Sequence, residues 1–377
     1  RISEEPFFGN LKKNIDNVKL RLSYGSLGNQ QVGYYDYIQT INTNGTMNYI
    51  FGDQKKGSYA SVSDPNSADL TWETVSTWNV GLDLGFLNNR LNLTADAYVR
   101  DTKGMQTSGK KLPGAYGANE PKQNAANLRT KGWELMLTWN DAFKLANKPF
   151  RYNLSVGLAD NTSEITKFDN PSKILSDYYV GQKLGDIWGY VVDGLFRTDE
   201  EAANYNVDQT AVNFVINTAQ VNPGLHAGDM KFVDLDGDHT ISSGSNTADD
   251  PGDRKIIGNS LPRYTYSIQG GFDWYGFDFS IYLQGVGHQD WYPGTNSVFF
   301  WGPYARPYSS FIPRDFLSQV WSPENPDAYF PRPIGYLALG NNRSLGVVND
   351  RYLQNLAYCR VKNITVGLSL IHISEPT

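Results

Sequence analysis

The sequence has little cysteine and histidine, and these shortages exclude several kinds of site. Cys359 is the single cysteine, so no disulfide can form within the chain, and the redox compartment stays undecided. None of the 4 histidines is spaced from another as metal ligands are, and neither a nucleophile-elbow motif nor a phosphate-binding loop occurs. We therefore expect no enzymatic site.

Long apolar runs and an excess of positive charge are also absent. No apolar run reaches about 18 residues, which excludes a transmembrane helix. The formal net charge of −6 argues against a nucleic-acid partner. The chain begins with Arg1, without a signal segment, and we therefore expect it to be a fragment of a longer protein. We interpret the last residues, 371–377, as a non-native tail from sequencing-adapter read-through and exclude them from fold reasoning.

Aromatic residues and glycine are abundant. The chain has 24 Tyr, 18 Phe, 9 Trp and 36 Gly, yet its mean hydropathy is −0.47. Outer-membrane β-barrels combine these features, because only every second strand residue meets lipid and aromatic residues gather at the membrane interfaces. The composition is thus typical of a transmembrane barrel.

The stretch from Trp72 to Arg100 predicts a β-hairpin with one apolar and one polar face. Two runs alternate with a period of two residues, and they flank a short turn at residues 87–89. Each run is about ten residues long, which is the length that a tilted strand needs to cross a bilayer.

Eight runs of this kind occur, at about 17–28, 74–86, 90–100, 131–139, 150–160, 262–274, 277–288 and 356–370. The connections between them have 45, 3, 30, 10, 101, 2 and 67 residues, so long and short connections alternate. Bacterial outer-membrane barrels have short turns on the periplasmic side and long loops outside. A soluble β-sandwich is the alternative, although loops this long are uncommon in compact domains.

Seven tracts resemble the SusC/RagA family of TonB-linked outer-membrane transporters, in the order of that family. They are LRLSYGSLGNQ (20–30), LTWETVSTWNVGLDLGFLNNRLNLTADAYVRDTKGM (70–105), NLRTKGWELMLTWN (127–140), GQKLGDIWGYVVDGLF (181–196), GDMKFVDLDGDHTI (228–241), IIGNSLPRYTYSIQGGFDWYGFDFSIYLQGV (256–286) and YLQNLAYCRVKNITVGLSL (352–370).

The resemblance implies that residues 1–370 form the C-terminal part of a 22-stranded antiparallel transmembrane β-barrel with long extracellular loops. It also implies a multi-pass protein of the cell outer membrane that imports oligosaccharides or peptides, with energy relayed by TonB through a missing N-terminal part and with a SusD-like lipoprotein as partner. A secreted, calcium-binding and carbohydrate-binding β-protein without transport activity is the alternative.

An acidic segment predicts a calcium-type loop. Asp234, Asp236 and Asp238 occupy its positions 1, 3 and 5, and Thr240 would offer its carbonyl at position 7. Position 6 holds His239 in place of the usual glycine, and Asp253 is the candidate for the last, displaced carboxylate. We expect weak structural calcium binding that stiffens a long external loop. A solvated acidic turn without an ion is the alternative.

Aromatic residues also cluster in the connection after residue 288. They include Trp291, Tyr292, Phe300, Trp301 and Tyr304. Exposed flat rings stack on sugar rings, so these residues are candidates for substrate binding. Packing between loops, or contact with the lipoprotein partner, is the simpler alternative.

Two structural expectations follow from the alternation. Val80, Leu82, Leu93, Ala95, Leu135 and Leu154 should face lipid, whereas Asp83, Asp96 and Glu134 should face the lumen. The inward set is mostly small and polar, which suits a wide lumen, so this chain should not close a barrel by itself.

Overall fold

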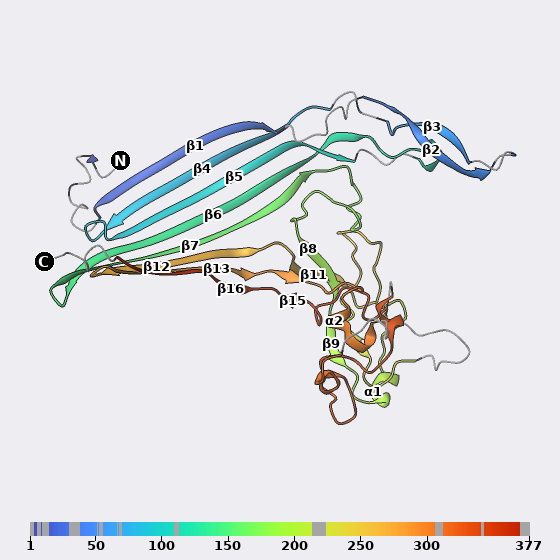
Figure 1. Ribbon diagram of the computed structural model, residues 1–377. Coiled ribbons are helices and arrows are strands. Elements are labelled where there is room, and N and C mark those ends of the chain that lie inside the picture. Colours follow the sequence, from blue (N-terminus) through green and yellow to red (C-terminus); the bar gives the residue numbers. More distant parts are fainter. Residues whose placement is uncertain are drawn as a thin grey trace.

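The computed structural model describes residues 4–5, 9, 15–29, 38–50, 52, 56–65, 67, 70–108, 113–212, 224–305, 312–340 and 343–369. Eight strands form one antiparallel sheet in the order β1-β4-β5-β6-β7-β12-β13-β16 (Figure 1). They are β1 (Asn17–Asn29), β4 (Glu73–Phe86), β5 (Leu91–Ser108), β6 (Lys122–Leu145), β7 (Lys148–Lys167), β12 (Arg263–Trp274), β13 (Phe277–His288) and β16 (Tyr358–Leu368). All eight predicted runs are strands of this sheet, which confirms the predicted antiparallel all-β fold.

The other elements lie in the connections. They are β2 (Ile41–Ile50), β3 (Lys56–Val62), β8 (Asp186–Tyr190), β9 (Val192–Leu195), α1 (Asp199–Ala203), β10 (Met230–Phe232), β11 (Arg254–Asn259), β14 (Asp290–Trp291), α2 (Val298–Trp301) and β15 (Gln354–Asn355), with 3₁₀ turns at Gly114–Tyr116, Gly302–Tyr304, Phe316–Gln319 and Tyr336–Leu339. Among the described residues, no helix has the length and apolar character needed to cross a membrane.

Three tight turns join neighbouring strands at one end of the sheet (Figure 1). Ala146 and Asn147 have φ of 49° and 60°, and Tyr275 and Gly276 have φ of 51° and 82°. Positive φ at both central residues is the geometry of a two-residue hairpin turn whose twist matches that of the flanking strands. The remaining turn carries three positive-φ residues, at 87–89. The long connections leave from the other end, which we call the long-loop end.

Several strands are longer than the predicted runs. β6 extends over 24 residues and β7 over 20, so the predicted connection of 10 residues between them is a two-residue turn. At about 3.3 Å per residue, β6 is far longer than a bilayer core of about 30 Å requires. These strands therefore project beyond a membrane at the long-loop end, and predicted boundaries based on apolar alternation ended too early.

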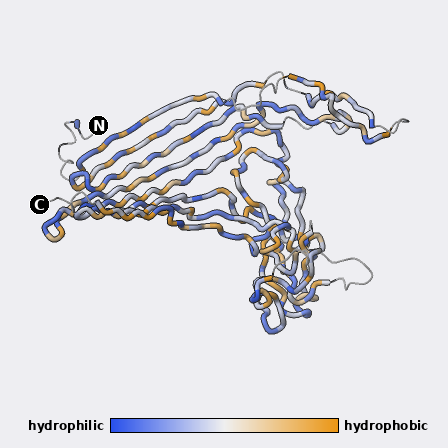
Figure 2. The backbone as a smooth tube through the Cα atoms, in the orientation of Figure 1, coloured by the Kyte–Doolittle hydropathy of each residue, from blue (hydrophilic) through white to orange (hydrophobic). Residues whose placement is uncertain are grey.

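The two faces of the sheet differ in polarity, and Figure 2 shows the alternation along the strands. Val80 pairs with Ala97, and Leu93 lies between Leu84 and Leu137, all on one face. On the other face, Asp96 lies between Gly81 and Glu134. The predicted division of these positions between two faces thus agrees with the strand register. We call the face with Val80 the apolar face and the face with Asp96 the polar face.

Aromatic rings form a continuous row on the apolar face near the tight turns. The ring centroids of Phe143 and Phe150 are 5.0 Å apart, those of Phe150 and Phe272 are 5.4 Å apart, and those of Phe272 and Phe279 are 5.5 Å apart. Trp274 adds an indole N–H that donates to the Leu145 carbonyl at 3.2 Å. Such a row is typical of the interfacial girdle of a transmembrane barrel.

The sheet is open. β1 and β16 are its two edges, and in the described part of the chain they do not pair with each other. This confirms the expectation that the eight strands do not close a barrel.

The two longest connections fold together into one body with its own hydrophobic core at the long-loop end (Figure 1). The first connection, between β7 and β12, contributes Phe232 and Ile241, each 0% exposed. The second connection, between β13 and β16, contributes Trp301 and Tyr352, also 0% exposed. We call this body the loop unit.

Candidate functional site

The polar face of the sheet carries a charged network near the β1 edge. The Arg21 guanidinium donates to both carboxylate oxygens of Asp83, at 3.0 Å each, and to those of Asp96, at 2.9 and 2.7 Å. Glu134 lies beside Asp96 on the next strand, and none of the described residues forms a hydrogen bond or ion pair with its carboxylate. The polar face therefore carries both ion-paired and unpaired charged side chains.

The acidic loop of the loop unit brings three carboxylates together. Oxygens of Asp234, Asp236 and Asp253 all lie within 4.8 Å of one another. Asp253 comes from far along the chain, and its two oxygens accept the backbone N–H of Leu235 and of Ser242, at 2.7 Å each. It therefore holds both ends of the acidic loop.

Asp253 is 0% exposed. Burial, followed by repulsion from Asp236 and Asp234, raises its pKa above the usual value of 3.8. A buried carboxylate that faces two others is poorly stabilised in its charged form, and a hard cation would neutralise all three. The residues present thus fit a calcium ion held by oxygen ligands.

The backbone of the acidic loop adopts the required turn in spite of the missing glycine. His239 has a φ of 63°, which is the left-handed conformation that position 6 needs. Its N–H donates to the second carboxylate oxygen of Asp234 at 3.0 Å. The histidine that stands in place of the usual glycine is therefore accommodated.

The structure does not bring all predicted calcium ligands together. The Asp238 carboxylate accepts the Thr240 N–H at 2.7 Å and lies outside the group of three. The predicted roles of Asp238 and of the Thr240 carbonyl as ligands stay predictions, and Asp234, Asp236 and Asp253 form the better-supported set.

The predicted aromatic cluster is divided by burial. Trp301 is 0% and Tyr304 1% exposed, and Tyr292 and Phe300 pack against the same core. The buried rings of Trp301 and Tyr304 cannot offer a face to a sugar, so packing between the loops, the simpler alternative, accounts for them. Trp291 is 41% exposed, and its role in binding stays a prediction.

A cavity that our sequence reasoning missed lies at the rim where the sheet meets the loop unit. It has a volume of about 460 Å³ and is lined from β7, β8, β11, β12, β13 and β14. We call it the rim cavity. No sequence motif marks it, because its residues come from six strands spread between residues 161 and 290.

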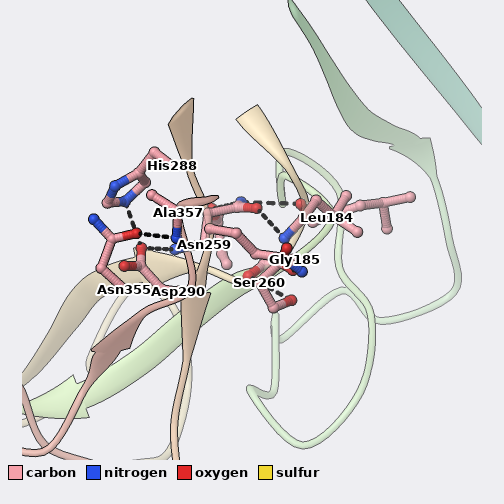
Figure 3. Close-up of polar contacts among 11 residues, drawn as sticks. Leu184, Gly185, Asn259, Ser260, His288, Asp290, Asn355 and Ala357 are labelled. Carbon is pink, nitrogen blue, oxygen red and sulfur yellow. Dashed lines mark hydrogen bonds and ion pairs between the residues drawn. The ribbon is translucent and has the colours of Figure 1, made fainter. Parts of the chain in front are cut away.

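A hydrogen-bonded node fixes one wall of the rim cavity (Figure 3). Asp290 is 6% exposed. Its carboxylate accepts a hydrogen bond from the Asn259 N–H and contacts the His288 Nε2, both at 2.9 Å. The Asn259 amide in turn donates to the Leu184 carbonyl at 3.0 Å and to the Asp186 carboxylate at 3.1 Å. Strand ends of the sheet are thereby tied to the start of the first long connection.

A family model and individual relatives point to the same protein family. Residues 10–311 match the family described as TonB dependent receptor-like, beta-barrel. The TonB-dependent receptor P39 of Formosa agariphila is 27% identical over 396 residues, which are 98% of this chain and 35% of that protein. The TonB-dependent receptor SusC of Bacteroides thetaiotaomicron is 28% identical over 386 residues, covering 98% of this chain and 33% of SusC.

Solved structures show the same fold. The RagAB peptide importer in its open-open state aligns with a TM-score of 0.65 at 19% identity, covering 94% of this chain and 34% of the compared chain. The RagAB peptide transporter aligns with a TM-score of 0.64 at 18% identity, over 96% of this chain and 35% of that one. The chain thus spans about a third of the length of these relatives.

The family match covers seven of the eight sheet strands and the whole first long connection. The chain therefore belongs to the TonB-dependent receptor-like β-barrel family, and its sheet is part of the wall of an outer-membrane barrel.

Proposed function

We propose that the protein containing this chain is an outer-membrane importer of oligosaccharides or peptides that is energised through TonB. The two faces of the sheet carry this proposal. An apolar face suits contact with lipid, and an inner face of small and polar residues suits a wide, hydrated lumen. The similarity to SusC and to the RagAB peptide importer supports transport as the activity.

The inner face offers many hydrogen-bonding groups, and small and polar side chains predominate where β7 pairs with β12. Asn153, Ser155 and Gly157 of β7 lie opposite Gly271, Gln269 and Ser267 of β12. A lumen lined in this way leaves room for a large polar solute.

Uptake by cells tests this proposal. Cells that express the complete protein should accumulate a labelled oligosaccharide or peptide, and a protonophore should abolish accumulation because it removes the energy that TonB relays. Accumulation that persists with the protonophore would contradict energised import.

Detergent dependence separates the importer from the alternative of a secreted binding protein. The apolar face exposes large side chains, such as Trp78 at 64% and Val80 at 50%. The complete protein should therefore aggregate without detergent. A complete protein that stays monodisperse in plain buffer would support the secreted alternative.

We further propose a SusD-like surface lipoprotein as partner, docked at the long-loop end. Exposed apolar side chains on the loop unit support this, including Leu317 at 75% and Tyr336 at 51%. Such side chains on a well-packed body are typical of an interaction surface. Co-purification of the tagged complete protein with the lipoprotein, and its loss in a variant with Leu317→Glu and Tyr336→Glu, is the test.

A structural calcium ion is the third element of the proposal. Asp234, Asp236 and Asp253 would hold the ion, which would neutralise their mutual repulsion and stiffen the first long connection. Calcium is favoured over zinc because the three ligands are carboxylates, without a histidine or cysteine among them.

Protease sensitivity reports on this ion. Cleavage between Gly224 and Asp253 should be slower with calcium than with a chelator, and Asp236→Ala should remove the difference. The four samples are the wild type and Asp236→Ala, each with calcium and with a chelator. Equal cleavage in all four would show that the segment is an ordinary acidic turn.

A further inference from the structure

Tyr264, the second residue of β12, has an unusual backbone conformation at the start of a regular ladder. Its neighbours pair in unbroken register, Arg263 with His288 and Thr265 with Val286, yet Tyr264 has a φ of 53°. An aromatic residue in the left-handed region is a genuine outlier that costs free energy. The facing residue is Gly287, where an added Cβ would lie 3.0 Å from the Tyr264 Cβ. The fold therefore maintains this backbone conformation at a cost in free energy.

The left-handed backbone places Tyr264 in the rim cavity. Strict alternation would put Arg263 and Tyr264 on opposite faces of the strand, but both line this one cavity. The Tyr264 residue is 47% exposed. An exposed aromatic residue thus lines the cavity.

A buried carboxylate holds the arrangement in place. Asp160, 8% exposed, accepts two hydrogen bonds of 2.6 Å from the Arg263 guanidinium and one of 3.4 Å from the Tyr264 N–H. The Arg263 Cζ in turn lies 5.5 Å from the centroid of the Tyr264 ring, over its face. One face of the ring is therefore backed by a fixed cation, and a ligand would stack on the other face.

Two polar side chains of the described residues that line the cavity have no hydrogen-bond partner. Asn161 and Lys183 line the same cavity, and among the described residues neither side chain has a hydrogen-bond partner. The amide can both donate and accept, and the ammonium donates. A ligand in this cavity could thus be hydrogen-bonded as well as stacked.

The charges of the lining balance one another. Lys183 and Arg263 are positive, whereas Asp186 and Asp290 are negative. A balanced lining gives no net attraction to an acidic or a basic ligand. An aromatic platform with donors and acceptors at its edge matches a neutral ring that has an apolar face and a rim of hydroxyl groups.

We propose that Tyr264 is the stacking platform of a binding site for a neutral sugar unit in the rim cavity, with Asn161 and Lys183 as hydrogen-bonding partners. The inference rests on the proposed import function and selects oligosaccharides as the class of substrate that this site takes. The backbone strain at Tyr264 is then the free-energy cost of holding this residue in the cavity.

Binding to the complete protein in detergent tests the proposal. The probes are maltohexaose, cellohexaose, xylohexaose, laminarihexaose and mannohexaose, and a casein digest serves as the peptide arm, each measured by calorimetry. At least one neutral oligosaccharide should bind the wild type. Tyr264→Ala should weaken that binding about ten-fold, equivalent to about 1.4 kcal/mol, whereas Tyr264→Trp should retain it.

Tyr275→Ala is the matched control. Tyr275 is also an exposed tyrosine with left-handed backbone, and the Lys148 ammonium lies 4.8 Å from its ring centroid, but it is in a tight turn at the opposite end of the sheet. Its replacement should leave sugar binding unchanged. Equal losses in both variants would contradict a specific role for Tyr264.

Tyr264→Asn separates binding from folding. Asparagine tolerates the left-handed region better than tyrosine, so this variant should unfold at the same or a higher temperature while losing the sugar. A lower unfolding temperature with unchanged binding would mean that Tyr264 is only a structural residue.

The remaining outcomes distinguish this inference from the import proposal. Peptides that bind in a Tyr264-dependent way, with no oligosaccharide bound, would overturn the sugar assignment and leave import intact. No binding in either arm would overturn the site. Absence of energised uptake by wild-type cells would overturn import itself.

Discussion

Val80 and Asn79 are neighbours on β4 that face opposite sides of the sheet. Val80→Arg should destabilise the complete protein in a bilayer by about 2–4 kcal/mol, because it places a charge in lipid near the midplane. Asn79→Arg, on the polar face, should cost less than about 1 kcal/mol. Reversible denaturant unfolding in lipid vesicles measures both. Equal costs would refute the assignment of the faces.

Two expectations about single residues change once the strand register is known. From the sequence, Leu93→Arg should cost as much as a midplane charge, but Leu93 lies only two residues from Leu91, which pairs with Trp139 near the aromatic row. We therefore expect a smaller cost there. Asp96→Asn should be mild from the sequence alone, but Asp96 is paired with Arg21, so Glu134→Gln is the better neutral control.

Calcium affinity should depend on pH through Asp253. Its pKa is raised above 3.8 by burial, whereas the N–H groups of Gly237 and His239 outweigh burial and lower the pKa of Asp234. Calcium needs the ionised form, so affinity should rise as the pH rises through the raised pKa of Asp253. Calorimetric titration of calcium at several pH values on both sides of that pKa measures the affinity.

Two variants serve as controls for the calcium titration. Asp253→Asn should weaken binding and flatten its dependence on pH, because the titrating group is removed. Asp238→Asn, outside the group of three, should have a smaller effect. A larger effect at Asp238 than at Asp253 would restore the ligand set expected from the sequence.

The sequence predicts only part of the local chemistry. The acidic loop is visible because its carboxylates are closely spaced in the chain, and Asp253 could be named as a displaced partner. Tyr264 could not be identified, because its importance lies in a backbone dihedral that alternation does not encode. Its neighbours in the rim cavity meet only through strand pairing.

The two longest connections are linked by a charged pair. The Arg332 guanidinium donates to Asp229 at 2.6 and 3.2 Å, and Asp229 is 3% exposed. Asp229→Asn should destabilise the loop unit by about 1–3 kcal/mol, less than a fully buried pair because the Arg332 side chain is 34% exposed. Hydrogen exchange should then speed up in both connections together.

Asp327→Asn is the control for this prediction. Asp327 also bridges the two connections, through Arg197 at 2.6 Å, but both side chains are more than half exposed. Its loss should cost less than about 1 kcal/mol. Faster exchange in only one connection after Asp229→Asn would show that the loop unit is two independent parts.

The aromatic cluster shows why loops are harder to read than strands. Strand alternation is a local signal, so all eight strands were predicted. A run of aromatic residues in a long connection is equally consistent with a binding surface and a core, and only the packing partner decides. Phe330, which stacks on Tyr304 at 5.7 Å, lies in the same connection but carries no periodic signal.

The architecture as a whole follows from two patterns, strand alternation and the alternation of loop length. Together they predict an antiparallel sheet with one lipid-facing side and with all tight turns at one end. In the structure the three tight turns lie at one end of the sheet, and its two faces differ in polarity as predicted. The number of strands in the complete barrel is beyond what eight strands specify. The predicted total of 22 therefore stays a prediction from family resemblance.

The central claim is that β4 is part of a barrel wall with lipid on one side and water on the other. Nitroxide labels at single positions from Thr77 to Phe86 test it in the complete protein in bilayers, after Cys359→Ser removes the exposed native cysteine. Accessibility to oxygen should peak at Trp78, Val80, Leu82 and Leu84, and accessibility to a water-soluble nickel complex at Asn79, Gly81 and Asp83. Accessibility without this two-residue period would contradict the account.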